Sequence, residues 1–316
     1  MTHPAPIVSV SVDLDSIACY YRIHALGDAP PEDIRHSVLR LCLPRFGELF
    51  ARQGVRATFF VVGEDLDADP EGRALLARLA QDGHELASHT YSHPYDLVRL
   101  SPARIAEEID KAHAVIGETA GTAPVGFRAP GYEITETVLQ TLVDRGYAYD
   151  SSVFPAVPYY LAKAAVMAGM RVLGRKSGSI LGSPRVLRAP TDPYRPDLGS
   201  VYQPGSSPIV ELPITVLPWT RIPVIGTAIV MAPEMLRQRL VASALRLPFF
   251  NFELHGIDLA DASGDAMPQD LISKQPDLGR PLWKKLAALE ATLIQARNVG
   301  ARFMPLRDAA QQFANR

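Results

Sequence analysis

The chain has little of what several classes of protein require. It contains only two cysteines, Cys19 and Cys42, which have no metal-binding spacing and whose sparseness is typical of a reducing compartment; a disulfide between them stays open. Its net charge is −2 and is spread along the chain. Nucleic acid is therefore excluded as the main partner, because phosphate binding requires a concentrated basic surface.

Two further absences concern membranes and nucleotides. No run reaches the roughly 18 uninterrupted apolar residues of a membrane span, and the N-terminus has no basic region followed by an apolar one, as a signal peptide would. We therefore expect a cytoplasmic protein, with a peripheral contact on the inner face of the membrane left open. After the first expected strand, "VDLDSIACYY" stands where a Gly-rich phosphate fingerprint would lie, which disfavours a dinucleotide-binding sheet.

What the chain does have is a regular alternation of short β-rich runs and longer helical patterns. With 316 residues, 47% of them apolar, it can build a large core. The alternation predicts parallel strands joined by crossover helices, and thus an α/β barrel or a doubly wound sheet. Polar residues follow five different strands, as expected where the strand ends of a barrel converge on one face. They are Asp13 and Asp15, His89 and His93, Arg128, Asp150, and His255. We therefore favour a barrel.

The first two clusters together suggest a metal site. Asp13 and Asp15 are two apart on a strand, so both side chains can point to the barrel mouth, where two like charges are costly unless a cation or a proton lies between them. One of these carboxylates with His89 and His93 gives three ligands and leaves positions for water and substrate, as in catalytic metal sites. Each part alone has a simpler explanation: acids often cap the turn after a strand, and two nearby histidines arise by chance.

The polar residues at the other strand ends are candidates for proton transfer. If one Asp binds the metal, the other can act as a base on a water that the metal acidifies. His255 in "FELHG" is then a candidate general acid for a leaving amine, and Arg128 in "FRAPG" can hold the base ionised. Taken singly, the two would be interpreted as a half-buried histidine and a surface ion pair.

The ordered set Asp-x-Asp, "ATFFVVG", His-x-x-x-His, Arg-x-Pro and Leu-His resembles the NodB-homology polysaccharide deacetylase family, over residues 7–155 and 209–310. The resemblance implies a single irregular (β/α)7 barrel domain over residues 1–316 and metal-dependent hydrolysis of an N-acyl group. It implies Asp13 as general base, Arg128 as the residue that tunes it, and His255 as general acid. It also implies Asp15, His89 and His93 as metal ligands, and the backbone of Gly131 or Tyr132 as the oxyanion donor.

Three departures from the family pattern limit the transfer of roles. Leu14 separates the two acids, which are adjacent in the common motif; "VDLD" is similar to a subgroup with cytoplasmic deacetylases and deformylases. The aromatic-rich fourth motif is missing, so Asp150 in "YDSSVFP" is only a second-shell candidate, and Glu211 is its rival for orienting His255. Residues 156–208 form a large insertion.

The insertion contains an apolar segment whose only charges are basic: Lys163, Arg171, Arg175 and Lys176. Residues 159–176 therefore predict either a helix on an anionic membrane or lipid carrier, or a helix that simply packs on the barrel. Trp219, in a second apolar loop, is a candidate wall for a sugar or lipid tail, or part of an ordinary covering loop.

These observations favour removal of an acetyl or formyl group from an amino sugar that is carried on a lipid or a nucleotide. One carboxylate and two imidazoles suit zinc, with cobalt, nickel, iron and manganese as alternatives. Two other functions stay open. One is hydrolysis of a cyclic ureide, an imide or another non-sugar amide, and the other is an inactive sugar-binding barrel.

Overall fold

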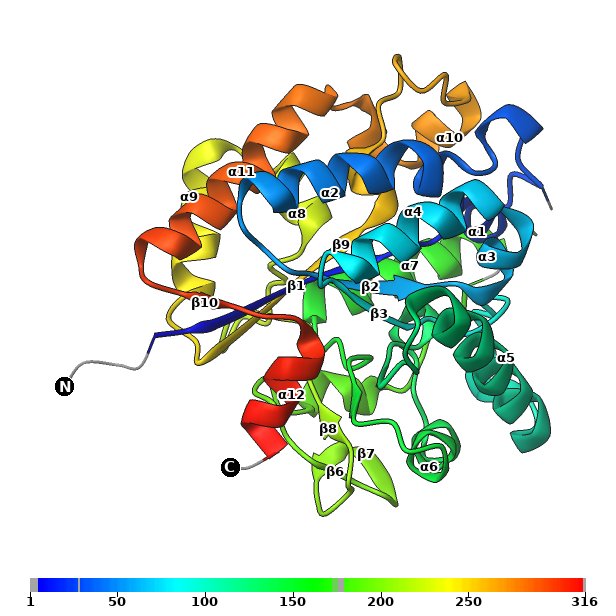
Figure 1. Cartoon of the computed structure of the whole chain (residues 1–316), viewed down its shortest axis with the longest axis vertical. Coiled ribbons are helices and arrows are strands. Elements are labelled where there is room, and N and C mark those ends of the chain that lie inside the picture. The colour runs from blue at the N-terminus through cyan, green and yellow to red at the C-terminus, as the bar shows by residue number, and fades with distance from the viewer. Residues whose placement is uncertain (1–4, 28, 173, 175–178, 315–316) are drawn as a thin grey trace.

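The chain forms a curled sheet of parallel strands with helices packed around its outside (Figure 1). The computed structural model describes residues 5–27, 29–172, 174 and 179–314. The strands of the main sheet are β1 (Ile7–Asp13), β2 (Thr58–Val61), β3 (Glu85–Ser88), β4 (Gly126–Phe127), β5 (Tyr149–Asp150), β8 (Val210–Glu211), β9 (Phe249–His255) and β10 (Arg302–Phe303). The helices are α1 (Ile17–His24), α2 (Leu43–Arg52), α3 (Gly63–Ala68), α4 (Pro70–Gln81), α5 (Pro102–Ala120), α6 (Glu136–Asp144), α7 (Val157–Val172), α8 (Gly226–Met231), α9 (Glu234–Ala244), α10 (Gln269–Lys274), α11 (Leu282–Asn298) and α12 (Leu306–Ala314).

The order of the strands is that of a barrel. β9 pairs with β1 along its whole length, and β2, β3, β4, β5 and β8 follow on the other side, every pair parallel. β10 adds to the first two residues of β1. The segment after β8 reaches β9, because the Thr215 backbone N–H donates to the Asn251 carbonyl oxygen at 3.4 Å and the Asn251 backbone N–H donates to Thr215 Oγ1 at 2.9 Å. The predicted irregular (β/α)7 barrel is thus confirmed.

Strand β1 shows why this sequence makes a barrel wall. All seven of its residues are buried, as expected for a parallel strand covered on both faces. Val8, Val10 and Val12 join the apolar layer beneath the helices. The alternate residues face inward, where Ser11 Oγ donates to Asn251 Oδ1 at 3.2 Å and Asp13 ends the strand. The barrel interior is therefore polar toward the carboxyl ends of the strands.

Helix boundaries follow local chemistry. Helix α5 begins after Ser101, whose hydroxyl accepts a hydrogen bond from the Arg104 backbone N–H, and it ends at Gly121 in a left-handed conformation. Helix α2 follows a π-helical turn over Val38–Cys42 and starts with Pro44 in its first turn, where the missing N–H of proline costs no helical hydrogen bond.

The insertion at residues 156–208 lies between β5 and β8, which are neighbours in the sheet. It contains α7, a 3₁₀ helix over Pro184–Arg188, and the antiparallel hairpin of β6 (Pro196–Asp197) and β7 (Ser200–Pro204). Cys19 and Cys42 are both buried and free, so they form no disulfide. Among the described residues, no helix has the length and apolar character to cross a bilayer.

Candidate active site

The polar residues singled out in the sequence meet at the carboxyl end of the barrel. Asp13 is the last residue of β1, Asp15 follows it, His89 follows β3, and Arg128 follows β4. His255 is the last residue of β9 and pairs in register with Asp13. Because the strands are parallel, their carboxyl ends open on one face, and all of these side chains reach it.

Asp15, His89 and His93 form a buried cluster of potential metal ligands. Asp15 Oδ1 lies 3.2 Å from His89 Nε2 and 3.1 Å from His93 Nε2. His89 Nδ1 lies 2.7 Å from the Arg128 carbonyl oxygen, to which it donates, so its Nε2 lone pair faces the cluster. His93 adopts a left-handed backbone conformation, φ 54°, and this sharp turn brings it back beside His89.

The chemistry of these donors fits a divalent cation. Burial alone would raise the pKa of Asp15, but the two histidines hold it well below its ordinary value. Burial lowers the pKa of His93, which favours the neutral imidazole that a metal requires. Within the described residues, Asp15 Oδ1 and His93 Nε2 have no hydrogen-bond partner although both are buried. Such orphaned atoms are rare in native interiors and point to a ligand between them.

Asp13 lies beside this cluster and pairs with a fully buried arginine. Arg128 Nη1 is 2.5 Å from Asp13 Oδ1. The remaining guanidinium hydrogens go to the Ser151 carbonyl oxygen at 2.9 Å and to the Ser11 and Ser151 hydroxyls. Burial raises the pKa of Asp13, and Arg128 opposes that rise. The result is a fixed carboxylate that is more basic than an exposed aspartate.

His255 is oriented by a carboxylate that the sequence analysis missed. Its Nδ1 lies 3.0 Å from Glu253 Oε1, two residues earlier on β9. The Tyr132 hydroxyl lies 3.1 Å from the same Glu253 oxygen and 3.0 Å from His255 Nε2. Neither Asp150 nor Glu211 contacts His255, so the prediction that one of them orients it is wrong. The alternation of a strand is the signal that could have found Glu253, since residues two apart share a face.

Asp150 and Glu211 instead form a buried carboxyl pair behind the site. Burial raises the pKa of both, and the nearby Asp150 raises that of Glu211 further. Asp150 accepts from the Ser152 hydroxyl at 2.6 Å, and Ser152 in turn accepts from the Ala129 backbone N–H at 2.8 Å. The pair therefore holds the loop that surrounds Arg128.

The candidate metal ligands Asp15 and His89, together with Asp13 and His255, open into a small cavity of about 100 Å³. At about 30 Å³ each, it holds roughly three waters. Of its walls, Gly131 and Tyr132 were predicted as substrate contacts, whereas Tyr20, Tyr95, Tyr159 and Ile23 were not. We call this cavity the tyrosine cup. A group the size of an acyl amide fits inside, and the rest of a larger substrate would lie outside.

Two predicted substrate contacts are corrected by the structure. Trp219 is fully exposed and does not line the tyrosine cup. The Tyr132 backbone N–H donates to the Ala129 carbonyl oxygen at 3.0 Å and is therefore occupied, while the Tyr132 side chain lines the cup. Of the two predicted oxyanion donors, Gly131 is the one that stays a candidate.

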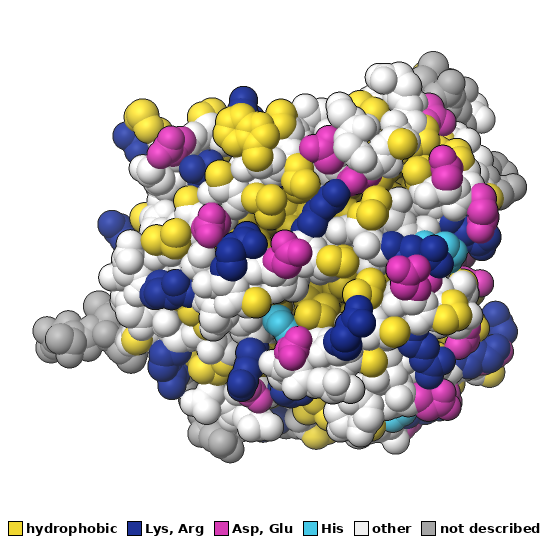
Figure 2. Space-filling model, turned by 45° about the horizontal axis from the view of Figure 1, so that its top comes forward, with side chains coloured by type: hydrophobic (Ala, Val, Ile, Leu, Met, Phe, Trp, Pro, Cys, Tyr) yellow, Lys and Arg dark blue, Asp and Glu magenta, His cyan; other side chains and the backbone are white. Residues whose placement is uncertain are grey.

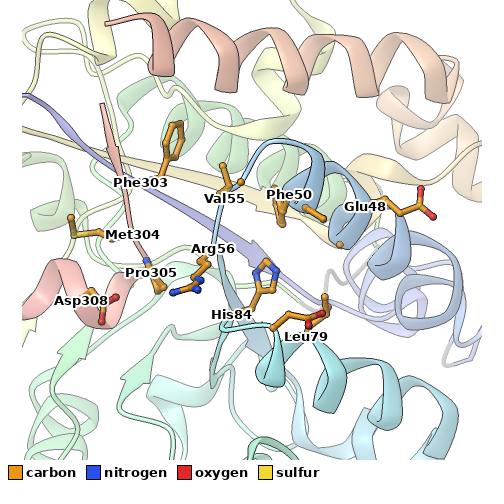
Figure 3. Close-up of a pocket in the computed structure, with 14 residues that line it drawn as sticks. Glu48, Phe50, Val55, Arg56, Leu79, His84, Phe303, Met304, Pro305 and Asp308 are labelled. Carbon is orange, nitrogen blue, oxygen red and sulfur yellow. The ribbon is translucent and has the colours of Figure 1, made fainter. Parts of the chain in front are cut away.

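A larger cavity, about 860 Å³, lies elsewhere in the fold. Figure 3 shows residues of α2, α4 and the segment after β10 around it, including Phe50, Arg56 and His84. Arg56 and His84 precede β2 and β3, so the cavity lies at the amino ends of these strands. None of the metal-ligand or proton-transfer candidates lines it, and barrel chemistry is built at the opposite strand ends.

Comparison with known proteins agrees with this geometry. Residues 37–149 match the polysaccharide deacetylase family model. A chitooligosaccharide deacetylase of Bradyrhizobium is 37% identical over 108 residues, which are 34% of this chain and 48% of the relative. A peptidoglycan deacetylase of Helicobacter pylori is 26% identical over 159 residues, which are 49% of this chain and 53% of the relative. The chain thus spans about half the length of these curated relatives.

The likeness to solved structures extends over nearly the whole chain. A Mycobacterium smegmatis protein assigned as a polysaccharide deacetylase superimposes with a TM-score of 0.61 at 19% identity, over 98% of this chain and 94% of its own. A peptidoglycan N-acetylglucosamine deacetylase gives a TM-score of 0.51 at 16% identity, over 97% and 89%. At such identities the comparison shows the fold. Residues 37–149 thus match the polysaccharide deacetylase family model, and the fold over nearly the whole chain is that of solved proteins assigned to the same group.

Proposed function

We propose that the protein is a metal-dependent hydrolase that removes an N-acyl group from an amino sugar. The observation that carries the proposal is the juxtaposition, around one cup, of Asp15, His89 and His93 with the Asp13–Arg128 and His255–Glu253 pairs. The curated relatives named above are deacetylases of chitooligosaccharide and peptidoglycan, which supports a substrate of this chemical class.

The three-ligand cluster would hold a divalent metal, for which we favour zinc over cobalt, nickel, iron or manganese. Such a metal acts as a Lewis acid toward a water and the acyl carbonyl. Asp13 takes the proton of the attacking water, and Arg128 fixes the carboxylate that receives it. His255 delivers a proton to the leaving amine. The Gly131 backbone N–H is the proposed donor to the oxygen on which negative charge develops.

A second cluster, of Asp13, Glu253 and His255, also brings potential ligand atoms within 4.8 Å of one another. We assign it to proton transfer because its charges are already balanced. The Arg128 guanidinium neutralises Asp13, and a protonated His255 neutralises Glu253. Burial opposes protonation, but Glu253 raises the pKa of His255 well above its ordinary value. His255 therefore starts the reaction with the proton that it must donate.

Glu253→Gln should move the basic limb of the pH profile of kcat/KM to lower pH by roughly one unit or more. The limb reports the loss of the His255 proton, and removing the carboxylate lowers the pKa of that imidazole. The acidic limb, set by Asp13, should change less. Glu211→Gln is the matched control because this equally buried carboxyl does not touch His255, and its basic limb should stay in place. An unmoved limb in Glu253→Gln would contradict the role of Glu253.

The size of the tyrosine cup favours one second candidate. A cavity of about 100 Å³ also suits a compact cyclic ureide or imide, whose ring would be opened by the same base and acid. The two candidates differ in what lies outside the cup: an N-acyl sugar extends beyond its mouth, and a cyclic amide does not.

Amine release should be measured with metal-stripped and zinc-reloaded protein. Short N-acetyl chitooligosaccharides, N-formyl amino sugars and hydantoin serve as the substrates. We expect release from an acylated sugar by the reloaded protein, only background when stripped, and a lower melting temperature of the stripped protein. Ring opening of hydantoin without amine release from sugars would favour the second candidate, and equal activity of the stripped protein would contradict both.

Whether the sugar is carried on a lipid or a nucleotide is a finer part of the proposal. The apolar and basic insertion supports a lipid carrier, and its helix α7 contributes Tyr159 to the cup. Lipid-linked and free N-acyl sugars should therefore be compared at equal concentration in the same assay. Equal kcat/KM for the two would remove the lipid part of the proposal and leave the deacylation intact.

A further inference from the structure

Helix α7 has the surface of a helix that lacks its partner. Its residues are mostly apolar, yet none of them is fully buried. Leu161, Val166 and Val172 are 59%, 63% and 87% exposed. Tyr159 lines the tyrosine cup, and Lys163 pairs with Glu133 at 3.4 Å, so these two side chains attach the helix to the barrel. A helix that is apolar on all sides is ordinarily covered on all sides.

The second exposed apolar element is the hairpin of residues 216–223, closed by a bridge between Val216 and Pro223. Trp219 near its tip is 100% exposed, and Ile222 is 39% exposed. The hairpin is held in place, because both terminal nitrogens of Arg221 donate to the Ala189 carbonyl oxygen at 3.1 Å. Trp219 therefore stands out from a fixed loop. Burying a side chain of this size gains more than burying almost any other.

These two elements belong to one rim. The Tyr160 hydroxyl on α7 donates to the Gly182 carbonyl oxygen at 3.0 Å, just before the 3₁₀ helix Pro184–Arg188. Ala189 directly follows that helix, and its carbonyl oxygen accepts the hydrogen bonds from Arg221 of the hairpin. A shared apolar cluster of Phe154, Ala156, Ile214 and Val216, with Tyr132, Tyr159 and Ile225 against it, joins the base of the hairpin to the start of α7. We call α7, the 3₁₀ helix Pro184–Arg188 and the hairpin of residues 216–223 the docking rim. Tyr132 and Tyr159 connect it to the tyrosine cup.

The charge of the docking rim has one sign. Residues 151–191 include no aspartate or glutamate, although the whole chain has 34 acids against 32 Lys and Arg. Arg171, Arg185 and Arg188 are exposed on this stretch, whereas Arg175 and Lys176 lie outside the described residues. Elsewhere the signs mix: on the face shown in Figure 2, acidic and basic side chains are interspersed.

We propose that the docking rim binds the surface of an anionic lipid bilayer. An exposed Trp, exposed aliphatic side chains and several arginines are what an interfacial membrane contact requires. A second copy of this chain fits less well, because the same basic stretch would face itself. Docking would place the tyrosine cup at the lipid headgroups. The substrate would then be an acyl sugar anchored to a lipid, a conclusion that rests on the proposed function.

The two tryptophans of the chain allow a direct test with full-length protein. Trp219 is in the docking rim, and Trp283, 68% exposed, is at the start of α11. Trp283→Phe leaves Trp219 as the sole reporter, and its emission should shift to the blue when phosphatidylglycerol vesicles are added, but not with phosphatidylcholine alone. Trp219→Phe, the matched variant, should show no shift. A shift from Trp283, or none from Trp219, overturns the proposal.

Charge is tested by vesicle sedimentation. Arg185→Gln with Arg188→Gln should weaken binding to phosphatidylglycerol vesicles by about thirtyfold, since each arginine near an anionic surface contributes roughly fivefold to binding. Deacylation of a short soluble substrate should be unchanged, so a failure of docking and a failure of the proposed chemistry are seen separately. Unaltered sedimentation, or light scattering that shows dimers formed through the docking rim without lipid, overturns the proposal.

Discussion

Asp13→Asn should lower kcat by about a thousandfold or more while the protein keeps its metal. Positioned proton transfer contributes a factor of roughly 10²–10⁴ to a rate. Asp13 lies beside the three-ligand cluster but pairs with Arg128, whereas both histidines contact Asp15. Asparagine preserves the size of the side chain and an oxygen for Arg128 but accepts no proton. The measurement is kcat on an N-acyl sugar, together with the zinc content of purified protein.

Asp150→Asn is the matched control for this loss. Its carboxyl group is equally buried but faces Ser152 and Glu211. Since burial disfavours two charges on the Asp150–Glu211 pair, a neutral amide should replace one of the two groups at little cost. We expect kcat to stay within about tenfold of the parent protein, less than the range of a lost general base. An Asp13→Asn protein that turns over normally, or that loses its zinc, would contradict the mechanism.

Arg128→Met should lower the free energy of unfolding by about 3–5 kcal/mol, the usual cost of removing one partner of a buried ion pair. The guanidinium is fully buried, stacks over the Phe60 ring at 4.1 Å from its centroid, and neutralises Asp13. Methionine fills much of the volume but leaves the Asp13 carboxylate uncompensated. Denaturant unfolding at pH 8 and pH 5 measures the effect.

The pH dependence has a definite sign. Without Arg128 the pKa of Asp13 rises further, so the penalty begins above the pKa of the unfolded state, grows with pH up to the raised native pKa and is constant above it. The stability loss should therefore be smaller at the lower pH. Adding Asp13→Asn to Arg128→Met should recover part of it. Arg145→Met breaks a partly exposed pair with Asp110 and should cost at most about 1 kcal/mol. An equally small loss of unfolding free energy in Arg128→Met would contradict the stabilising role of the buried Asp13–Arg128 ion pair.

The metal cluster and its base could be predicted because strand order alone brings them together. Parallel strands place the residues after β1, β3 and β9 on one face whatever the loops between them do. The predicted ligands Asp15, His89 and His93 do lie within ligand distance of one another. Their roles as ligands, base and acid stay predictions until a metal and a rate are measured.

The surroundings of the site were harder to predict because they depend on packing. The tyrosine walls come from α1, the loop after β3, the loop after β4 and α7, and no periodicity connects such distant segments. Trp219 was wrongly predicted to line the site because an exposed hairpin tip and the wall of a cavity can both be apolar in sequence. Glu253 was overlooked because a resemblance to other proteins directed attention to Asp150 and Glu211, although β9 itself carries the acid.

The candidate catalytic residues and the large insertion lie on different parts of the barrel. The candidate catalytic residues stand on or after β1, β3, β4 and β9, whereas residues 156–208 enter between β5 and β8 without interrupting the pairing of those two strands. Surface loops lengthen at little thermodynamic cost. A change in this inserted segment can therefore alter the surroundings of the tyrosine cup without moving the candidate catalytic residues.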